Sequence, residues 1–164
     1  MKLPVIETER LILRPWRPQD AEALFSYARL PEVALPAGWS PHRSAAESER
    51  TIREVYRNKC LALTLRGEDC PFGNIGLHNT SLCKSLHAVE TRELGFSMSP
   101  VFWGHGYMTE AARSLIDYAF CLLELDCILL AHFSDNERTE RIASRLGFSY
   151  IFTRGNEKFY NLFQ

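Results

Sequence analysis

The sequence lacks the cysteine spacing of a metal site or a disulfide framework. Its 5 cysteines are an odd number, and no two of them form a C-x-x-C pair, the spacing typical of zinc ribbons and redox motifs. We therefore expect no metal site, and we expect reduced thiols that are mostly buried, as free cysteines usually are. The cysteines are Cys60, Cys70, Cys83, Cys121 and Cys127.

An excess of one charge and a long apolar run are also absent. The 19 Lys and Arg residues nearly balance the 20 Asp and Glu residues, so no global positive field attracts nucleic acid or anionic membranes. No apolar run approaches the roughly 20 residues that cross a bilayer, and the start, MKLPVIETERLIL, lacks the features of a signal peptide. We expect no nucleic-acid or membrane partner, and a cytoplasmic location.

The composition is that of a single globular domain. The chain has 164 residues, of which 46% are hydrophobic and 24% are charged. These values are typical of a chain that folds around one apolar core and argue against disorder. We therefore predict one domain over residues 1–164.

Apolar periodicity predicts helices and strands in mixed order. Ser44 and Glu47 form an S-x-x-E capping box that starts a helix, and Gly147 is a helix C-terminal stop. The predicted order is strand 10–14, a helix to about residue 28, loop 31–43, a helix from 44 to about 59, strands 60–66, 73–80 and 91–98, a helix from 109 to about 125, strand 127–134, helix 136–146, and strands 149–154 and 158–163. This order predicts an α/β (α+β) protein with one layer of sheet and helices on both faces.

The stretch FWGHGYMTEA, residues 102–111, precedes the longest predicted helix. Gly104 and Gly106 can adopt positive φ, which lets successive backbone N–H groups turn toward one anion. The helix adds unpaired N–H groups and the positive end of its dipole. A simple tight turn is the alternative, and neither a dinucleotide fingerprint nor a Walker loop is present. The loop therefore favours a pyrophosphate.

Glu110 opposes this interpretation. Its carboxylate stands in the first turn of the predicted helix, where it suits the helix dipole but repels a phosphate. The pyrophosphate hypothesis therefore requires that Glu110 points sideways or is bound to a partner.

Three segments resemble one enzyme superfamily. They are ELGFSMSPVFWGHGYMTEAARSLIDYAF, the opening ETERLILR, and NERTERIASRLGF with its N-x-x-S/T…L-G-F pattern. Each is similar to a segment of the GNAT N-acetyltransferases, especially of the RimJ/RimL-like branch that includes ribosomal-protein N-terminal acetyltransferases. The resemblance implies the GNAT acyl-CoA N-acyltransferase fold, a mostly antiparallel sheet with splayed fourth and fifth strands, and acetyl transfer from acetyl-CoA to a primary amine.

The chain departs from the superfamily pattern at several positions. In the pattern Q/R-x-x-G-x-G/A, Trp103 stands first and Met108 stands last. The tyrosine that many members use to protonate the leaving thiolate is replaced by Ala143. This loss keeps open a catalytically silent acyl-CoA-binding module.

The resemblance implies a cofactor site along the fourth strand and the glycine loop. The strand backbone would bind the pantetheine arm, the loop would bind the pyrophosphate, and Asn136 would bind the arm beyond the fifth strand. A helix N-cap is the alternative for Asn136. The implied cofactor-binding residues are Phe96, Ser97, Met98, Trp103, Gly104, His105, Gly106, Tyr107, Met108, Thr109 and Asn136.

The catalytic hypothesis is direct attack of a neutral amine on the thioester. Glu93 matches a catalytic glutamate of some superfamily members and is the candidate base; a solvated strand-edge carboxylate is its alternative. Thr139 aligns with a serine or threonine of the branch that lies near the cofactor sulfur, or is an ordinary helix-surface residue. His78 and His132 are weaker candidates, because a lone strand histidine is usually structural.

The acceptor amine stays open. Deprotonation at pH 7 costs about 1 kcal/mol for an α-amine and roughly 4 to 5 kcal/mol for a lysine, so an α-amine needs only a modest base. Trp39, His42 and Tyr160 are candidate pocket residues, although Trp39 equally suits an anchor of its loop on the core.

The leading hypothesis is acetylation of a protein N-terminal α-amine or of a small amine such as an amino acid, polyamine or antibiotic. The alternatives are the silent acyl-CoA-binding module and a binder of another phosphorylated ligand. Dimers are common among similar proteins, which makes a homodimer an option.

Overall fold

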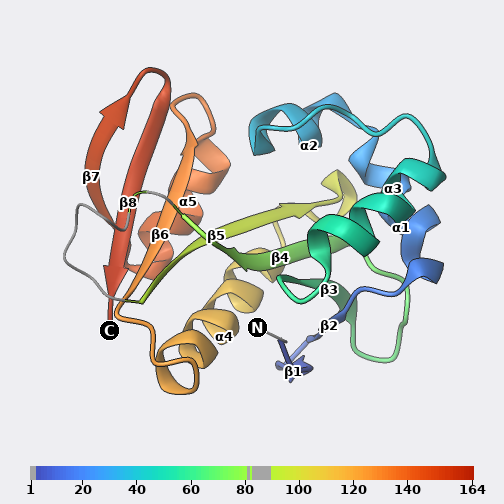
Figure 1. Cartoon of the computed structure of the whole chain (residues 1–164), viewed down its shortest axis with the longest axis horizontal. Helices are drawn as coiled ribbons and strands as arrows, with labels where there is room; N and C mark the ends of the chain where they lie inside the picture. Colours follow the sequence, from blue (N-terminus) through green and yellow to red (C-terminus); the bar gives the residue numbers. More distant parts are fainter. Residues whose placement is uncertain (1–2, 81, 83–89) are drawn as a thin grey trace. The chain divides into compact units, whose positions relative to one another are not determined.

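The computed structural model describes residues 3–80, 82 and 90–164 (Figure 1). The elements in chain order are β1 Ile6–Glu7, β2 Leu11–Pro15, η1 Pro18–Asp20, α1 Ala21–Ala28, α2 Pro31–Ala34, η2 Leu35–Ala37, α3 Ala45–Thr51, η3 Ile52–Tyr56, β3 Cys60–Leu65, β4 Gly73–His78, β5 Thr91–Met98, η5 Pro100–Phe102, α4 Tyr107–Cys121, β6 Cys127–Phe133, α5 Glu137–Leu146, β7 Ser149–Arg154 and β8 Glu157–Phe163. The eight strands have the order β1-β2-β3-β4-β5-β6-β8-β7.

The chain divides into two compact units. The first unit comprises the chain up to Gly76 together with Phe96–Ala111, and the second comprises Leu77–Gly95 together with Ala112–Gln164. Strands β4 and β5 and helix α4 run through both units. The single domain remains a prediction.

The predicted fold class is confirmed. The pairs β1–β2, β2–β3, β3–β4, β6–β8 and β7–β8 are antiparallel, and β5–β6 is parallel. The protein is therefore an α/β (α+β) protein with a mixed, mostly antiparallel sheet.

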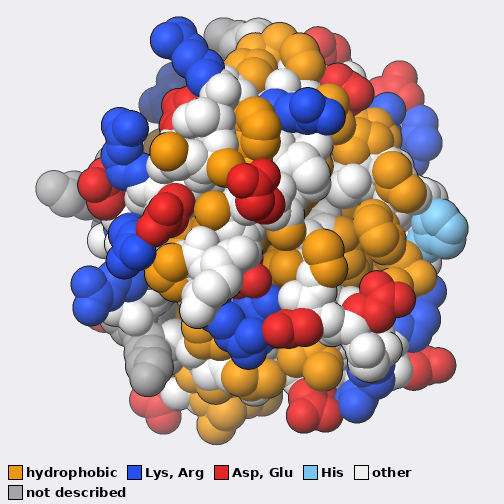
Figure 2. Space-filling view, turned by 90° about the vertical axis from the view of Figure 1, so that its right-hand side faces the viewer, with side chains coloured by type: hydrophobic (Ala, Val, Ile, Leu, Met, Phe, Trp, Pro, Cys, Tyr) orange, Lys and Arg blue, Asp and Glu red, His pale blue; other side chains and the backbone are white. Residues whose placement is uncertain are grey.

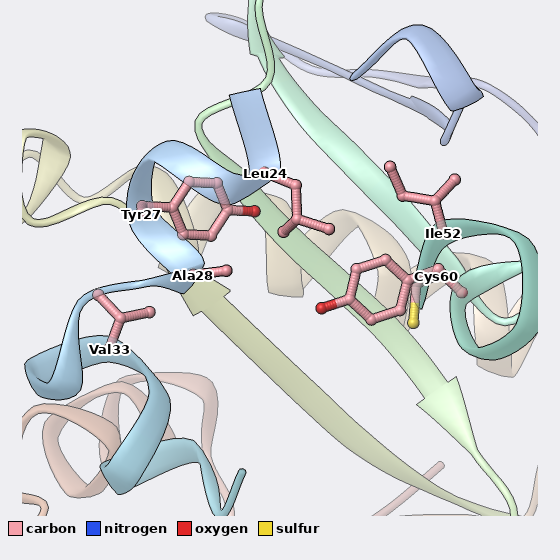
Figure 3. Close-up of a cluster of buried hydrophobic side chains, with 7 residues drawn as sticks. Leu24, Tyr27, Ala28, Val33, Ile52 and Cys60 are labelled. Carbon is pink, nitrogen blue, oxygen red and sulfur yellow. The ribbon is translucent and has the colours of Figure 1, made fainter. Parts of the chain in front are cut away.

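One hydrophobic cluster of the first unit lies between α1, α2, η3 and the start of β3. Helices α1 and α3 pack side by side (Figure 1). The cluster drawn in Figure 3 joins apolar side chains of α1, α2 and η3 to the first residue of β3. The cluster comprises Leu24, Tyr27, Ala28, Val33, Ile52, Tyr56 and Cys60. Strands β3 and β4 are almost entirely buried along their length, and β3, with the sequence CLALTL, is apolar at every position except Thr64.

A buried ion pair ties β2 to the start of α1. The guanidinium of Arg14 donates to both carboxylate oxygens of Asp20 at 2.8 and 2.9 Å, and Asp20 also accepts the N–H of Arg17 at 2.8 Å. The side chains of Arg14 and Asp20 are only 6% and 8% exposed. Arg14 also contacts Asp69, whose side chain is 69% exposed.

This pair gives a stability prediction. We expect Asp20→Asn to lower the free energy of unfolding by about 3 to 5 kcal/mol, because it removes the buried carboxylate and leaves the buried guanidinium with only the exposed carboxylate of Asp69. Asp69→Asn is the matched control and should cost much less, because water screens an exposed carboxylate. Urea unfolding of both variants measures the difference, and equal losses would contradict the importance of burial.

Two predicted segments differ from the structure. Residues 31–43, predicted as a loop, begin with the short helices α2 and η2, because Pro31 suits the first position of a helix and Gly38, at φ 81°, ends the second one. The helix from Ser44 is correctly placed, and Ser44 accepts the N–H of Glu47. It continues into a π-helix that ends at Tyr56 rather than near residue 59.

In the second unit, β6 lies between β5 and the β7–β8 hairpin (Figure 1). The parallel ladder pairs Thr91–Glu93 with Cys127–Leu129, and among the described residues no register pair carries it further. The β6–β8 ladder continues to Phe133. The described register pairs of the parallel ladder therefore end at Glu93, and a splay of the two strands beyond it remains a prediction. Helix α4 ends at Cys121, before the predicted end, and Glu124 with φ 51° turns the chain away.

The cysteine prediction is only partly right. Cys60 and Cys127 are buried, whereas Cys70 and Cys121 are exposed, and none of these four described cysteines is in a disulfide. Cys83 lies outside the described residues. Within the described part of the chain, no group of three or more His, Cys, Asp or Glu side chains is arranged to hold a metal ion, and no helix is long and apolar enough to span a membrane.

Candidate functional site

The glycine loop has the backbone that an anion site needs. Gly104 and Gly106 have φ of 82° and 77°, in the left-handed region that glycine adopts most readily. A Cβ added to Gly104 would meet nothing within 4 Å, so that glycine is required for its conformation and not for space. Helix α4 begins directly afterwards at Tyr107, so its first N–H groups extend the loop.

The N–H groups of the loop are largely free of protein acceptors. The first helical bond of α4 runs from the Glu110 N–H to the Gly106 carbonyl at 3.0 Å. Over the described residues, no hydrogen bond of the protein uses the N–H groups of Gly104, His105, Gly106, Tyr107, Met108 and Thr109. Available N–H donors therefore run through the loop and the first turn of α4. A simple tight turn would provide fewer such donors.

Trp103 does not belong to this run. Its N–H donates to the Pro100 carbonyl at 3.1 Å, and its indole Nε1 donates to the Met98 carbonyl at 2.9 Å. The run of available nitrogens therefore starts at Gly104, one residue later than the sequence suggested. The reason is the short helix η5, which uses the Trp103 N–H to close its last turn.

Glu110 is paired, as the pyrophosphate hypothesis requires. Its carboxylate accepts the Thr8 hydroxyl at 2.6 Å, the Arg10 N–H at 2.9 Å and the Arg10 Nε at 2.7 Å. Burial alone would raise the pKa of Glu110, but these donors outweigh it and hold the pKa below its usual value. The carboxylate is therefore ionised and its charge is balanced by Arg10.

Aromatic rings hold the loop in place. Phe102 stacks on Phe72 with ring centroids 4.1 Å apart, and Tyr107 lies tilted against Phe72 at 5.6 Å. His105 stacks on Tyr107 at 5.6 Å with an interplanar angle of 12°. These contacts limit the motion of the loop and preorganise its donors.

The end of β5 lies in the same unit as the loop. Ser97 and Met98 are buried and Phe96 is half-buried. Among the described residues, the Ser97 hydroxyl is buried without a hydrogen-bond partner, which is unusual for a buried polar atom. The backbones of β4 and β5 approach closely here, since a Cβ on Gly73 would lie 3.2 Å from the Ser97 carbonyl oxygen.

Trp39 and His42 lie together in the first unit. Their ring centroids are 5.3 Å apart, and Trp39 packs against the core cluster, so its anchoring role is supported. His42 Nδ1 lies 2.8 Å from the hydroxyl of the fully buried Ser48. Burial lowers the pKa of His42, although Glu47 opposes the shift, so the imidazole is neutral near pH 7.

Glu93 stands where the parallel ladder ends in the second unit. Burial raises the pKa of its carboxyl, a hydrogen bond with Thr80 lowers it, and the charge of Glu157 raises it further, with a raised pKa as the result. Glu93 is half-buried, so the alternative of a freely solvated strand-edge carboxylate does not describe it. A carboxyl with a raised pKa is suited to accept a proton near neutral pH.

Asn136 is the N-cap of α5, and its Oδ1 accepts the Thr139 N–H at 3.2 Å. The structural alternative for Asn136 is therefore correct, and a contact with the pantetheine arm remains a prediction. Thr139 lies half-buried in the first turn of the same helix.

A pair of substitutions separates these two roles of Asn136. Asn136→Ala should lower the free energy of unfolding by about 1 kcal/mol, because the cap is lost. Asn136→Asp should keep the cap, but it removes the amide donor and should weaken coenzyme A binding. Thermal unfolding and calorimetry measure the two effects, and unchanged affinity in Asn136→Asp would leave Asn136 with the capping role alone.

Tyr160 and the histidine candidates have protein partners. The Tyr160 hydroxyl donates to Glu140 at 3.2 Å, and its ring stacks on His132 at 5.2 Å. The Nδ1 of His132 lies 2.7 Å from the Phe133 carbonyl, while its Nε2 is buried without a partner among the described residues. His78 packs on the backbone of β5, because a Cβ on Gly95 would lie 3.1 Å from its ring.

The predicted site residues therefore fall into two groups. The first unit brings together the glycine loop, the end of β5 and the pair formed by Trp39 and His42; the second unit holds Glu93, Asn136, Thr139 and Tyr160. Sequence reasoning missed Thr8 and Arg10, which bind Glu110. They precede the glycine loop by roughly a hundred residues in the chain, so no local spacing could have linked them.

A family model described as the acetyltransferase (GNAT) domain matches residues 10–149. The chain belongs to this GNAT acetyltransferase family, which confirms the predicted fold, acetyl-CoA as the acetyl donor, and acetyl transfer to an amine.

Relatives agree with this assignment. YoaA of Bacillus subtilis (strain 168), named as an uncharacterized N-acetyltransferase, is 30% identical over 88% of this chain and 82% of its own. YdaF of the same organism, provisionally named a ribosomal N-acetyltransferase, is 36% identical over 85% of this chain and 78% of its own. The crystal structure of an acetyltransferase from Agrobacterium tumefaciens str. C58 has a TM-score of 0.81 at 25% identity, over 100% of this chain and 96% of that one. The similarity to YdaF supports the RimJ/RimL-like branch.

Proposed function

We propose that the backbone N–H groups of residues 104–109 bind the pyrophosphate of acetyl-CoA. The observation that carries this proposal is the run of N–H groups ahead of α4 that have no acceptor within the described chain, next to a Glu110 carboxylate whose charge is already balanced. Such donors, added to the dipole of the helix, are suited to an anion of two phosphates. Trp103 would support the loop through its own bonds rather than through its N–H.

The proposed site extends along β5. Acetyl-CoA supplies an acetyl thioester when it is bound. The backbone of Phe96–Met98 would hold the pantetheine arm, and the Ser97 hydroxyl, which is buried without a partner among the described residues, would be one polar atom available to it. Asn136 would add a contact from the start of α5, and Thr139 would lie near the sulfur. We further propose that both units serve one N-acetyltransferase domain, since β4, β5 and α4 run through both.

Glu93 is the proposed general base. Its raised pKa suits removal of a proton from an ammonium group whose own pKa is close to neutrality. An α-amine has a reference pKa of about 7.8, so the base has little free energy to supply, whereas a lysine at about 10.4 demands far more. The site therefore favours an α-amine over a lysine side chain.

We propose a protein N-terminal α-amine as the acceptor class, with a small primary amine as the alternative. The provisional name of YdaF supports the first. Trp39, His42 and Tyr160 are the proposed acceptor contacts. Acidic and basic side chains are interspersed on the face drawn in Figure 2, which together with the balanced net charge supports a protein that binds no nucleic acid. A cytoplasmic location and a homodimer are further parts of this proposal.

A silent acyl-CoA-binding module is the second candidate. Ala143, at the position of the usual general acid, is fully buried and can donate no proton. The Tyr160 hydroxyl is already engaged with Glu140. A module of this kind would bind coenzyme A without transferring the acetyl group.

Thiol release distinguishes the two candidates. Acetyl-CoA is incubated with the protein and a panel of peptides with free N-termini, N-blocked lysine peptides, polyamines and amino acids, while calorimetry measures coenzyme A binding. We expect binding and turnover, with the highest rates on free N-termini. Binding without turnover on any acceptor would support the module, and absence of binding would contradict the cofactor site itself.

A further inference from the structure

Arg10 lies next to the glycine loop although it comes from the β1–β2 turn. The loop itself, residues 103–109, contains no lysine or arginine. The guanidinium of Arg10 lies over the ring of Tyr107, 4.5 Å from its centroid, and its side chain is 43% exposed. Arg10, from a distant part of the sequence, thus places a positive charge beside the proposed anion site, whose own residues include no lysine or arginine.

Each edge of the Arg10 guanidinium has a different neighbour. Nε donates to Glu110 at 2.7 Å, and Nη1 donates to the carbonyl of His105 at 3.0 Å. Nη2 lies 3.6 Å from the position that a Cβ on Gly106 would take, and no hydrogen bond within the described chain uses it. The planar guanidinium therefore binds the first turn of α4 and the loop carbonyl, and its third edge lies beside Gly106.

These contacts have an electrostatic consequence. The bond to His105 holds that carbonyl, whose partial negative charge would repel a phosphate, on the Arg10 side of the loop. The bond to Glu110 balances the carboxylate in the first turn of α4. Without Arg10, Glu110 would present an unbalanced negative charge at the place where an anion has to bind.

We infer that Arg10 is a positioning residue of the loop that selects ligands with a pyrophosphate. It fixes the His105 carbonyl, it balances Glu110, and it leaves Nη2 free to donate to a phosphate oxygen. This inference rests on the proposed binding of acetyl-CoA to the loop. The β1–β2 turn would then contribute to ligand binding as well as connecting two strands of the sheet.

Calorimetry with two probes tests this inference. Coenzyme A carries the pyrophosphate, whereas pantetheine lacks it. We expect Arg10→Gln to weaken coenzyme A binding by about tenfold or more, because charge-assisted hydrogen bonds are lost, and to leave pantetheine binding unchanged. Arg10→Lys keeps the charge but not the fork, so its affinity should fall between those of the wild type and Arg10→Gln.

A double variant and a matched control complete the test. Arg10→Gln with Glu110→Gln should bind coenzyme A about threefold or more tightly than Arg10→Gln alone, because the unbalanced carboxylate is gone. Arg66 is the control, since its Nε donates to the Thr8 carbonyl at 2.7 Å and its head contacts Glu7, yet no bond in the described chain joins it to the loop. Arg66→Gln should keep wild-type affinity.

The outcomes separate this inference from the proposed function. If the wild type binds no coenzyme A, the proposed cofactor site fails. If the wild type binds and Arg10→Gln binds equally well, or loses pantetheine to the same extent, only the role of Arg10 fails. If the double variant binds coenzyme A no more tightly than Arg10→Gln, the electrostatic role of Arg10 also fails. Contacts that only hold the structure together would not improve binding when Glu110 is replaced as well. Thermal unfolding without ligand confirms that each variant is folded.

Discussion

Replacing Gly104 and Gly106 together with alanine should weaken coenzyme A binding by roughly 30-fold to 1,000-fold. Both residues have positive φ, and an L side chain costs about 1 to 2 kcal/mol in that region. Alanine at both positions favours another loop conformation in the free protein, so the ligand has to restore the positive φ and the affinity falls by up to the sum of both costs, at about 1.4 kcal/mol per factor of ten. Calorimetry with coenzyme A gives the loss directly.

Gly67→Ala is the matched control for this double substitution. Gly67 has a φ of 84°, and a Cβ there would meet nothing within 4 Å, the same situation as at Gly104. It lies in the connection between β3 and β4 and has no proposed part in binding. We expect Gly67→Ala to lower the stability by the cost of one positive φ, about 1 to 2 kcal/mol, and to leave the affinity for coenzyme A unchanged. Wild-type affinity in the loop variant would mean that the conformation of the glycine loop does not matter for the ligand.

Glu93→Gln should lower kcat by roughly 100-fold to 10,000-fold, the range for removal of a general base. The amide has nearly the same shape as the carboxyl but cannot accept the proton of the substrate ammonium. Coenzyme A binding should be unchanged, because Glu93 is proposed to act on the amine. Steady-state thiol release with a free-N-terminus peptide measures the effect, and a kcat within about threefold of wild type would contradict the assignment.

The pH dependence of Glu93 provides an independent check. Burial raises the pKa of its carboxyl, so the acidic limb of the kcat/KM profile should lie above the usual range of a glutamate, with activity rising as Glu93 loses its proton. Glu157 raises the pKa further. Glu157→Gln should therefore move this limb to lower pH while the plateau stays the same.

The raised pKa of Glu93 also determines how its carboxyl affects the free energy of unfolding as the pH changes. A carboxyl whose pKa is raised in the folded protein stabilises the fold below its unfolded-state pKa, and this stability is lost as the pH rises through the folded-state pKa. Glu93→Gln should therefore be at least as stable as wild type at pH 7 in urea unfolding, although it is less active. If the contribution of Glu93 to stability, taken as wild type minus Glu93→Gln, falls as the pH decreases between the unfolded-state and folded-state pKa of Glu93, the expected direction of the effect is wrong.

Much of the fold follows from local patterns. The capping box at Ser44 and the stop at Gly147 lie where predicted, because caps depend on residues only a few positions apart. Strand β1, Ile6–Glu7, is too short for a period of two to be seen. The insertion of β8 between β6 and β7 could not be predicted, because pairing of strands distant along the chain depends on packing and leaves no local signal.

The candidate site likewise has features that the local sequence predicts and features that depend on contacts between distant segments. The positive φ values of Gly104 and Gly106 follow from the residue type, and the need for a partner of Glu110 follows from its charge. The identity of that partner does not, because Arg10 reaches Glu110 only after β2 has been placed beside the loop by the rest of the first unit. The Trp103 N–H donates to the Pro100 carbonyl and is therefore not available to a ligand. This bond belongs to the short helix η5, which the two glycines alone do not predict.

Backbone amide shifts under ligand titration test the anion site most directly. In ¹⁵N-labelled protein, we expect coenzyme A to move the N–H signals of residues 104–109 strongly, since hydrogen bonds to phosphate oxygens deshield the amide proton. Pantetheine should leave them nearly unmoved, and the Trp103 signal should respond least within the loop. If saturating coenzyme A moves other signals while those of residues 104–109 stay in place, the loop does not hold the pyrophosphate.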